Sequence, residues 1–241
     1  MVFRSMETIS KRHVIRRGFW DRVWLALVWR YVAHSIMVFI CIMGERVPAA
    51  TVSDRIISMT PFIPTIGRYN YHIWLLAYIP IAAWFWRLDR SRFVSFLYTG
   101  GTISLLRGLT IFVTSLGPVN GKDINAGASF SALFHSWLAV VNPVSALTSS
   151  APNIYLTKDL FFSGHTASTF LLWLYVRPYK NIGWVALVAH IIVVLTVFLS
   201  HLHYTIDVIG AWAITFSVFV LAEKWSKRRT VSGQANFAPF H

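Results

Sequence analysis

Two histidines and an aspartate lie in sequence contexts where they could act together on a phosphate ester. His165 is the fifth residue of Phe-Phe-Ser-Gly-His-Thr, and His203 begins His-Tyr-Thr-Ile-Asp, which ends at Asp207. Residues four positions apart share a helix face, so Asp207 can approach the ring of His203 if a helix has begun there. A neutral imidazole is a nucleophile for phosphorus, a carboxylate fixes its tautomer, and a second, protonated histidine can protonate a leaving alkoxide. These residue types therefore suggest phosphoryl transfer through a covalent intermediate.

The same residues allow two other interpretations. Two histidines and one carboxylate could instead hold a metal ion. Any single histidine near a membrane interface could also be purely structural, satisfied by its neighbours, and we interpret His72 and His190 in this way. Ser163 and Gly164 favour the phosphate interpretation, because they begin a predicted helix whose free backbone N–H groups would attract an anion.

The composition indicates a membrane protein. Hydrophobic residues make up 56% of the 241 positions and charged residues only 13%, whereas about 25% of residues in soluble domains are charged. The 11 Trp, 9 Tyr and 18 Phe suit the two membrane–water interfaces. The net charge of +13 is explained by basic residues beside apolar segments and by anionic lipid, so we expect no nucleic-acid partner. The single cysteine, Cys41, excludes an internal disulfide.

Apolar segments are distributed along the chain as in a polytopic, all-α membrane protein. A helix crosses about 30 Å of hydrocarbon with about 20 mostly apolar residues. We predict a basic N-terminal interfacial segment at 1–22, a transmembrane catalytic domain at 23–222 and a basic cytoplasmic tail at 223–241. The catalytic domain contains six predicted transmembrane helices, at 24–43, 71–86, 93–116, 160–176, 184–201 and 205–221.

Basic residues predict the orientation of these spans. With both termini cytoplasmic, 15 of the 22 Lys and Arg residues fall in inside segments and 5 in outside loops, as the positive-inside rule requires. The apolar segment 130–147 contains His135 and a helix-breaking Asn-Pro pair, so we expect an interfacial or re-entrant element at the outer face rather than a seventh span. The 38 residues from His165 to His203 then leave and return to that non-cytoplasmic face, which brings the two histidines together.

Parts of the sequence resemble motifs of one enzyme family. Residues 158–166, Lys-Asp-Leu-Phe-Phe-Ser-Gly-His-Thr, look like the Gly-Asp-x-x-Phe-Ser-Gly-His-Thr motif of sphingomyelin synthases and related lipid head-group transferases. Residues 203–207 resemble the His-Tyr-Thr-x-Asp motif of the same branch, and residues 92–114 resemble its segment from Arg-Arg through Tyr-Arg to Val-Thr-Thr-Leu-Pro. This branch belongs to the type 2 phosphatidic acid phosphatase superfamily. The resemblance covers about half of the chain and implies the same six spans.

The resemblance implies a role for each matched residue. His203 would be the nucleophile, Asp207 would orient it, and His165 would assist the leaving group. The phosphatase branch has a Ser-Arg phosphate clamp where this chain has Thr196 and Val197, so the missing clamp favours a transferase. The substrate- and phosphate-binding candidates are the cations Arg107 and Lys158, of which Lys158 replaces the family's Gly, together with Asp159, Ser163, Gly164 and Tyr204.

We therefore predict an integral-membrane lipid phosphotransferase. It would move a phosphorylated head group from a glycerophospholipid donor to the hydroxyl of ceramide or diacylglycerol through a phospho-His203 intermediate, with neither metal nor cofactor. A lipid phosphatase or phospholipase C-like hydrolase would use the same His165, His203 and Asp207 with water as the acceptor. A lipid-binding or scaffolding protein is the non-enzymatic alternative. The head group (choline, ethanolamine or inositol) and the existence of a homo-oligomer remain open at this stage.

Overall fold

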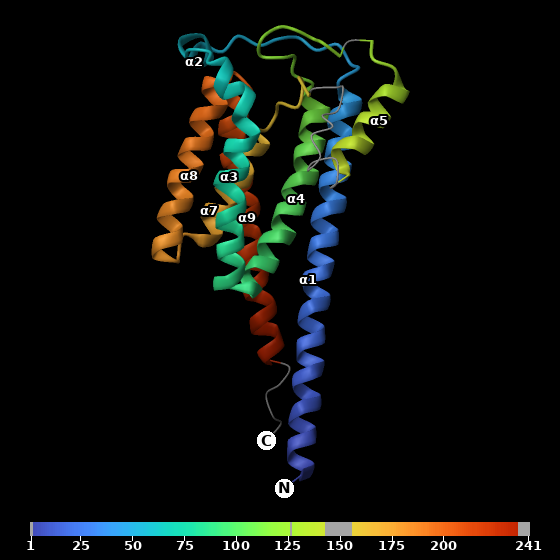
Figure 1. Cartoon of the computed structure of the whole chain (residues 1–241), viewed down its shortest axis with the longest axis vertical. Coiled ribbons are helices and arrows are strands. Elements are labelled where there is room, and N and C mark those ends of the chain that lie inside the picture. The colour runs from blue at the N-terminus through green and yellow to red at the C-terminus, as the bar shows by residue number, and fades with distance from the viewer. Residues whose placement is uncertain (1, 126, 143–155, 236–241) are drawn as a thin grey trace.

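The fold is a bundle of helices, as the composition predicts. A computed structural model describes residues 2–125, 127–142 and 156–235, and these residues contain helices and no strands. Figure 1 shows long helices running side by side, with the short helices Arg55–Met59 and Phe130–Val141 at one end. The helices are α1 (Val2–Gly44), α2 (Arg55–Met59), α3 (Pro64–Leu88), α4 (Arg90–Thr114), α5 (Phe130–Val141), α7 (Gly164–Val176), α8 (Lys180–Leu199) and α9 (Thr205–Ala235).

Length and composition support a multi-pass membrane protein. Among the described residues, four helical segments are long and apolar enough to cross a membrane: Gly18–Gly44, Arg90–Thr114, Lys180–Leu199 and Thr205–Arg228. These correspond to four of the six predicted spans. The other two predicted spans fall on α3, whose apolar character is interrupted by polar residues, and on α7, which has only 13 residues. The full set of six therefore stays a prediction.

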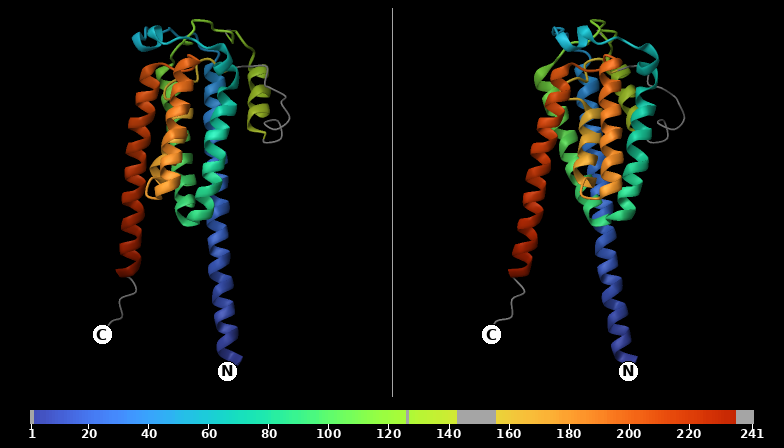
Figure 2. Two further views of the ribbon diagram at one scale, coloured as in Figure 1. Left: turned by 60° about the vertical axis from the view of Figure 1, so that its left-hand side comes forward. Right: turned by 90° about the vertical axis from the view of Figure 1, so that its left-hand side faces the viewer.

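The basic N-terminal segment and the first predicted span are one continuous helix. α1 runs without interruption from Val2 to Gly44 and extends beyond the other helices in every view (Figures 1 and 2). On the C-terminal side of the predicted domain, α9 continues from the last predicted span to Ala235. Residues 236–241 of the predicted tail lie outside the described residues.

The connections gather at two opposite ends of the bundle. The first turn of α1, the last turn of α9 and the short α3–α4 and α7–α8 turns lie at one end, which we call the terminal end (Figures 1 and 2). α2, α5, the segment before α7 and the α8–α9 turn lie at the other, which we call the loop end. The first and last helices thus start and finish at the same end, as an even number of spans requires.

The predicted outer-face element is partly described. α5 covers residues 130–141 at the loop end and packs against α1, where the indole of Trp137 donates to the carbonyl of Ser35 at 2.9 Å. Its 12 residues are too few for a perpendicular span of about 20 residues. Residues 143–147 of the same predicted element lie outside the described residues.

Short α7 is the central helix of the bundle. It packs against α3, α4, α8 and α9, and Leu171, Leu172, Leu174, Tyr175 and Val176 are all buried. The first residue of α7, Gly164, lies at the loop end. The packing of α7 in the middle of the bundle therefore fixes its first turn beside the loops. That start carries the Ser-Gly-His sequence singled out above.

Candidate functional site

The loop before α7 and the first turn of α9 are joined directly. Ser163 is the N-cap of α7, and its hydroxyl accepts from the backbone N–H of Thr166 at 3.3 Å. The backbone N–H of Ser163 itself donates to the carbonyl of Asp207 at 3.1 Å. This bond links the two predicted motifs across 44 positions of sequence. It also means that the Ser163 N–H is already satisfied within the protein.

The predicted His203–Asp207 pair is present and buried. Asp207 is 0% exposed, and its Oδ2 lies 3.4 Å from Nδ1 of His203. The same oxygen accepts the backbone N–H of Tyr204 at 2.9 Å, which fixes the carboxylate at the beginning of α9. This is a close approach and not a hydrogen bond, because Nδ1 of His203 and Oδ1 of Asp207 are both buried without a hydrogen-bond partner among the described residues. Asp207 is thus placed to orient His203.

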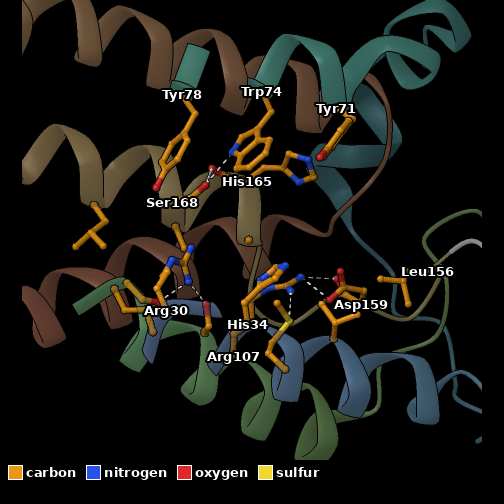
Figure 3. A pocket seen from close by; sticks show the side chains of 18 of the residues that line it. Arg30, His34, Tyr71, Trp74, Tyr78, Arg107, Leu156, Asp159, His165 and Ser168 are labelled. Carbon is orange, nitrogen blue, oxygen red and sulfur yellow. Dashed lines mark hydrogen bonds and ion pairs between the residues drawn. The ribbon is translucent and has the colours of Figure 1, made fainter. Parts of the chain in front are cut away.

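His165 lies at the start of α7 and faces a cavity of about 260 Å³. Figure 3 shows its ring beside Trp74 of α3, and the two ring centroids lie 5.7 Å apart in an edge-on arrangement. The bond from Ser163 N to the Asp207 carbonyl joins the His203 turn to the start of α7, which carries His165. Gly164, Arg107 and Asp159 also line this cavity, whereas His203 and Asp207 lie outside its lining.

Arg107 organises the segment that leads into α7. It is 6% exposed, and its Nε donates to the carbonyl of Phe162 at 2.7 Å. One terminal nitrogen forms an ion pair with Oδ1 of Asp159 at 2.5 Å and also donates to the Asp159 carbonyl. The side chain of Arg107 also fits closely against Gly164, where a Cβ would lie 3.1 Å from the guanidinium carbon. The charge of Arg107 is therefore matched by a carboxylate within the protein.

Lys158 and Tyr204 connect loops and do not line the cavity beside His165. The Lys158 ammonium donates to Asp123 and to the carbonyls of Glu45 and Val47, at 2.7, 2.7 and 2.9 Å. The Tyr204 hydroxyl donates to the carbonyl of Gly117 at 3.0 Å. The Lys158 ammonium and the Tyr204 hydroxyl are thus already hydrogen-bonded to protein groups at the loop end. A role of either residue in phosphate binding stays a prediction.

The sequence interpretation missed residues on α1 and α3 that line the same cavity. Arg30 and His34 reach it from α1, and Tyr71, Trp74 and Tyr78 reach it from α3 (Figure 3). Arg30 and His34 are four positions apart within an apolar helix. Ionisable residues inside a span are functional candidates by default, so this spacing was the available signal.

Asp54, which lies outside this cavity, is another residue that the sequence interpretation left without a role. One carboxylate oxygen caps α2 by accepting from Ile56 N and Ile57 N at 3.0 and 3.1 Å. The carboxylate also accepts from the backbone and hydroxyl of Thr205, at 2.5 and 2.9 Å, where α9 begins. Burial raises the pKa of Asp54, but the hydrogen bonds from Thr205, Ile57 and Ile56 together outweigh it and leave the pKa below its usual value. Asp54 therefore holds the turn that carries Asp207.

Two alternatives from the sequence can be compared with the geometry. Within residues 2–125, 127–142 and 156–235, no three His, Cys, Asp or Glu side chains come close enough to hold a metal ion, so the two-histidine, one-carboxylate metal site is not formed there. His190 contacts Thr169 and accepts from the indole of Trp212, both at 2.9 Å, which agrees with a structural role.

Comparison with known proteins confirms the resemblance read from the motifs. The family described as "PAP2 superfamily C-terminal" matches residues 158–224, which contain His165, His203 and Asp207. Phosphatidylcholine:ceramide cholinephosphotransferase 1 of Mus musculus is 26% identical over 224 residues, covering 83% of this chain and 51% of that protein. Sphingomyelin synthase-related protein 1 of Homo sapiens is 26% identical over 235 residues, covering 88% and 54%.

The similarity extends to a second group of transferases over a shorter region. Phosphatidylcholine:ceramide cholinephosphotransferase 2 of Mus musculus is 29% identical over 153 residues, covering 59% of this chain and 41% of that protein. The chain spans about half the length of the curated relatives it matches. Its similarity is to the sphingomyelin synthase-like branch of the superfamily, and it includes the segment that forms the site.

Proposed function

We propose that this protein is an integral-membrane phosphotransferase that moves a phosphorylated head group from a glycerophospholipid to the hydroxyl of ceramide or diacylglycerol. The observation that carries the proposal is the bond from Ser163 N to Asp207 O, which joins the His165 helix to the His203–Asp207 turn. Relatives of this chain are named as transferases of phosphocholine between phosphatidylcholine and ceramide. Their names support transfer of a phosphorylated head group as the reaction type here.

In the proposed first step, Nε2 of His203 attacks the phosphorus of the donor. Asp207 faces Nδ1 at 3.4 Å and stabilises the imidazolium that develops. The P–O bond to diacylglycerol breaks as the P–N bond forms, and His165 gives its proton to the leaving alkoxide. The side chain of His203 is only 6% exposed and does not line the cavity beside His165, so the proposed attack requires the phosphate to pass from that cavity to the His203 ring.

In the proposed second step, the acceptor lipid takes the head group. Its hydroxyl gives a proton to the now neutral His165 and attacks the phosphohistidine, so that the P–N bond breaks and a new P–O bond forms. The two histidines return to their starting protonation states. Water in place of the acceptor would give hydrolysis, so exclusion of water from the cavity decides between transfer and hydrolysis.

We place this site at the non-cytoplasmic face of the membrane. The proposal combines six spans with both termini in the cytoplasm, the basic segment 1–22 at the inner interface and the tail 223–241 inside the cell. It is supported by the common position of the first and last turns at the terminal end (Figure 2). The start of α7 and the α8–α9 turn, which carry the two histidines, lie at the loop end.

Purified protein in vesicles, incubated with donor phospholipid carrying a labelled head group, tests the proposal. We expect labelled product only when ceramide or diacylglycerol is present, and a labelled phosphoenzyme when the acceptor is omitted. His203→Ala should lose both, and His165→Ala should slow formation of the phosphoenzyme. His135→Ala, which removes an exposed histidine of α5, is the matched control. Turnover by His203→Ala, or release of the free phosphorylated head group whether or not acceptor is present, would contradict the transferase mechanism.

A further inference from the structure

Two arginines, Arg30 and Arg107, line the cavity beside His165, and they differ in whether a carboxylate pairs with them. Arg107 is paired with Asp159, as described above. Arg30 donates to the carbonyl of Gly100 at 2.8 Å and to the hydroxyl of Ser104. No Asp or Glu in the described part of the chain pairs with Arg30. One cationic group therefore lines the cavity without a carboxylate among the described residues to balance it.

The packing of α1 against α4 makes a place for this guanidinium. A Cβ at Gly100 would lie 3.3 Å from Nε of Arg30, so the absence of a side chain there gives the guanidinium its room. From α3, the side chain of Tyr78 points into the same cavity from the side opposite Arg30 (Figure 3). Arg30 is thus held by neutral groups of α4, and its side chain lines the cavity.

The distance from Arg30 to the part of the cavity beside His165 and Arg107 suits the length of a lipid head group. Arg107 contacts the sulfur of Met37 at 3.1 Å, and Met37 is seven residues beyond Arg30 on α1. Seven residues rise by about 10 Å along a helix. A phosphate between His165 and Arg107 would therefore leave the distal part of its head group near Arg30, with His34 lining the wall between them.

The part of the cavity lined by Arg30 disfavours a positively charged head group. A guanidinium seeks hydrogen-bond acceptors or anions, and like charges repel strongly away from bulk water. Asp159 is the one carboxylate among the described residues that line the cavity, and Arg107 already occupies it. A quaternary ammonium placed near Arg30 would meet a cation and find no free acid.

The aromatic residues of α3 do not form a cage for an ammonium group either. Such a cage needs several open ring faces around the cation. Tyr71 and Trp74 are stacked with centroids 5.7 Å apart, and Trp74 and Tyr78 with centroids 5.2 Å apart. The faces between these rings are therefore covered by one another.

We propose that Arg30 and Ser104 form a subsite for a hydroxyl-rich or anionic head group, so that the donor is an inositol or glycerol phospholipid rather than a choline or ethanolamine one. This inference rests on the proposed function, because it names the donor class for the same reaction. The transfer itself keeps the balance given above: phosphorus passes from the diacylglycerol oxygen to His203 and then to the acceptor oxygen, and His165 releases and regains one proton.

Two measurements on the full-length protein separate this inference from the proposed function. The first measures binding of glycerophosphoinositol, glycerophosphoglycerol and glycerophosphocholine by ligand-induced thermal stabilisation. The second measures head-group transfer from labelled phosphatidylinositol, phosphatidylglycerol, phosphatidylcholine and phosphatidylethanolamine. We expect the inositol and glycerol compounds to bind and react at least about tenfold better, the scale of one charge-assisted hydrogen bond.

Variants connect that preference to Arg30. Arg30→Gln should weaken binding and transfer of the inositol and glycerol compounds by about tenfold or more while leaving the choline compounds unchanged or improved. Arg22→Gln, which removes an exposed arginine of the same helix, is the control. Arg30→Lys keeps the charge but loses the planar guanidinium and its additional N–H donors, so it should give an intermediate loss. It is the variant to use if Arg30→Gln fails to fold.

The outcomes are distinguishable. A preference for choline or ethanolamine compounds, or an equal loss for all compounds in both Arg30 variants, would overturn the subsite. Selective binding of the inositol or glycerol compounds without transfer to any acceptor would uphold the subsite and contradict the proposed function. His203→Ala should keep the binding preference and lose the transfer.

Discussion

The two ends of the bundle are held together by different kinds of contact. At the loop end, side chains bond to the backbone of segments far away in sequence: Glu45 to Thr157 and Lys158, and Arg107 to Phe162. At the terminal end, aromatic rings pack edge to face. The difference indicates that the loop end is specified by directional contacts that fix the position of individual atoms, as a catalytic site requires.

The terminal end is organised around Tyr175 of α7. Its ring lies 5.7 Å from Phe96 and 5.1 Å from Phe219, both nearly perpendicular to it. Polar contacts near it include Thr99 to Tyr175 at 2.8 Å, Tyr179 to Asp89 at 2.7 Å and an ion pair between Arg92 and Glu223 at 3.6 Å. Such packing stabilises the bundle through buried apolar area, and it tolerates small shifts better than a hydrogen-bond network does. Variants at the two ends should therefore behave differently.

The largest effect is expected when Arg107 is removed. Arg107→Met leaves Asp159 without its cation and the Phe162 carbonyl without its donor, so the free energy of unfolding should fall by about 3–5 kcal/mol. The measurement is denaturant or thermal unfolding of purified protein in detergent. The double variant Arg107→Met/Asp159→Asn is the control, since it also removes the uncompensated charge. A double variant no more stable than the single one would contradict a charge-balancing role.

Glu45→Gln should come next. The buried carboxylate accepts from Thr157 N and Lys158 N at 2.7 and 2.8 Å, and from the Thr157 hydroxyl at 2.7 Å. An amide of the same size would turn an N–H₂ group towards these donors, and we expect a loss of about 2–3 kcal/mol. Head-group transfer should fall as well, because residues 157–163 lead into α7. Unchanged transfer in a destabilised protein would argue that this network serves stability alone.

Asp54→Asn tests the contact that holds the start of α9. An asparagine can still cap α2 with its amide oxygen, but its NH₂ group cannot accept the bond that the backbone N–H of Thr205 donates to the second carboxylate oxygen. We expect a loss of about 1 kcal/mol, and transfer should slow because Thr205 and Asp207 share the same turn. The pKa of Asp54 is lowered in the folded protein, so its contribution to stability is complete above about pH 4 and is lost as the pH falls through the lowered pKa. The wild type should therefore lose stability on acidification more steeply than Asp54→Asn. Parallel acid unfolding curves would remove the carboxylate from this role.

Tyr175→Phe should have the smallest effect and should not affect the loop end. It removes the hydroxyl that contacts Thr99, but Thr99 keeps its bond to the carbonyl of Ser95 at 2.9 Å. We expect a loss of about 1 kcal/mol in unfolding free energy and an unchanged rate of head-group transfer. Thr99→Val is the matched variant, and a double-mutant cycle gives the energy of the pair. A marked change in transfer by Tyr175→Phe would break the distinction between the two ends.

Local sequence patterns determined the helical, membrane-type character of the chain and the pairing of His203 with Asp207 in the predicted site. Apolar runs of sufficient length predict helices because the backbone must satisfy its own hydrogen bonds in lipid. The spacing of His203 and Asp207 predicts their contact because four residues make about one helical turn, and the structure places them 3.4 Å apart. These features depend on residues that are close in sequence.

Tertiary structure alone decided which charged groups face the cavity and which connect the loops. Lys158 and Arg107 were equal candidates for the phosphate, yet Lys158 is bound to Asp123 and the carbonyls near Glu45, while Arg30, without an assigned role in the sequence, faces the cavity. The physical reason is that α1 packs along α4 and the loops cross above them, so each cation meets partners that lie 35 to 113 positions away in sequence. No local periodicity encodes such pairings.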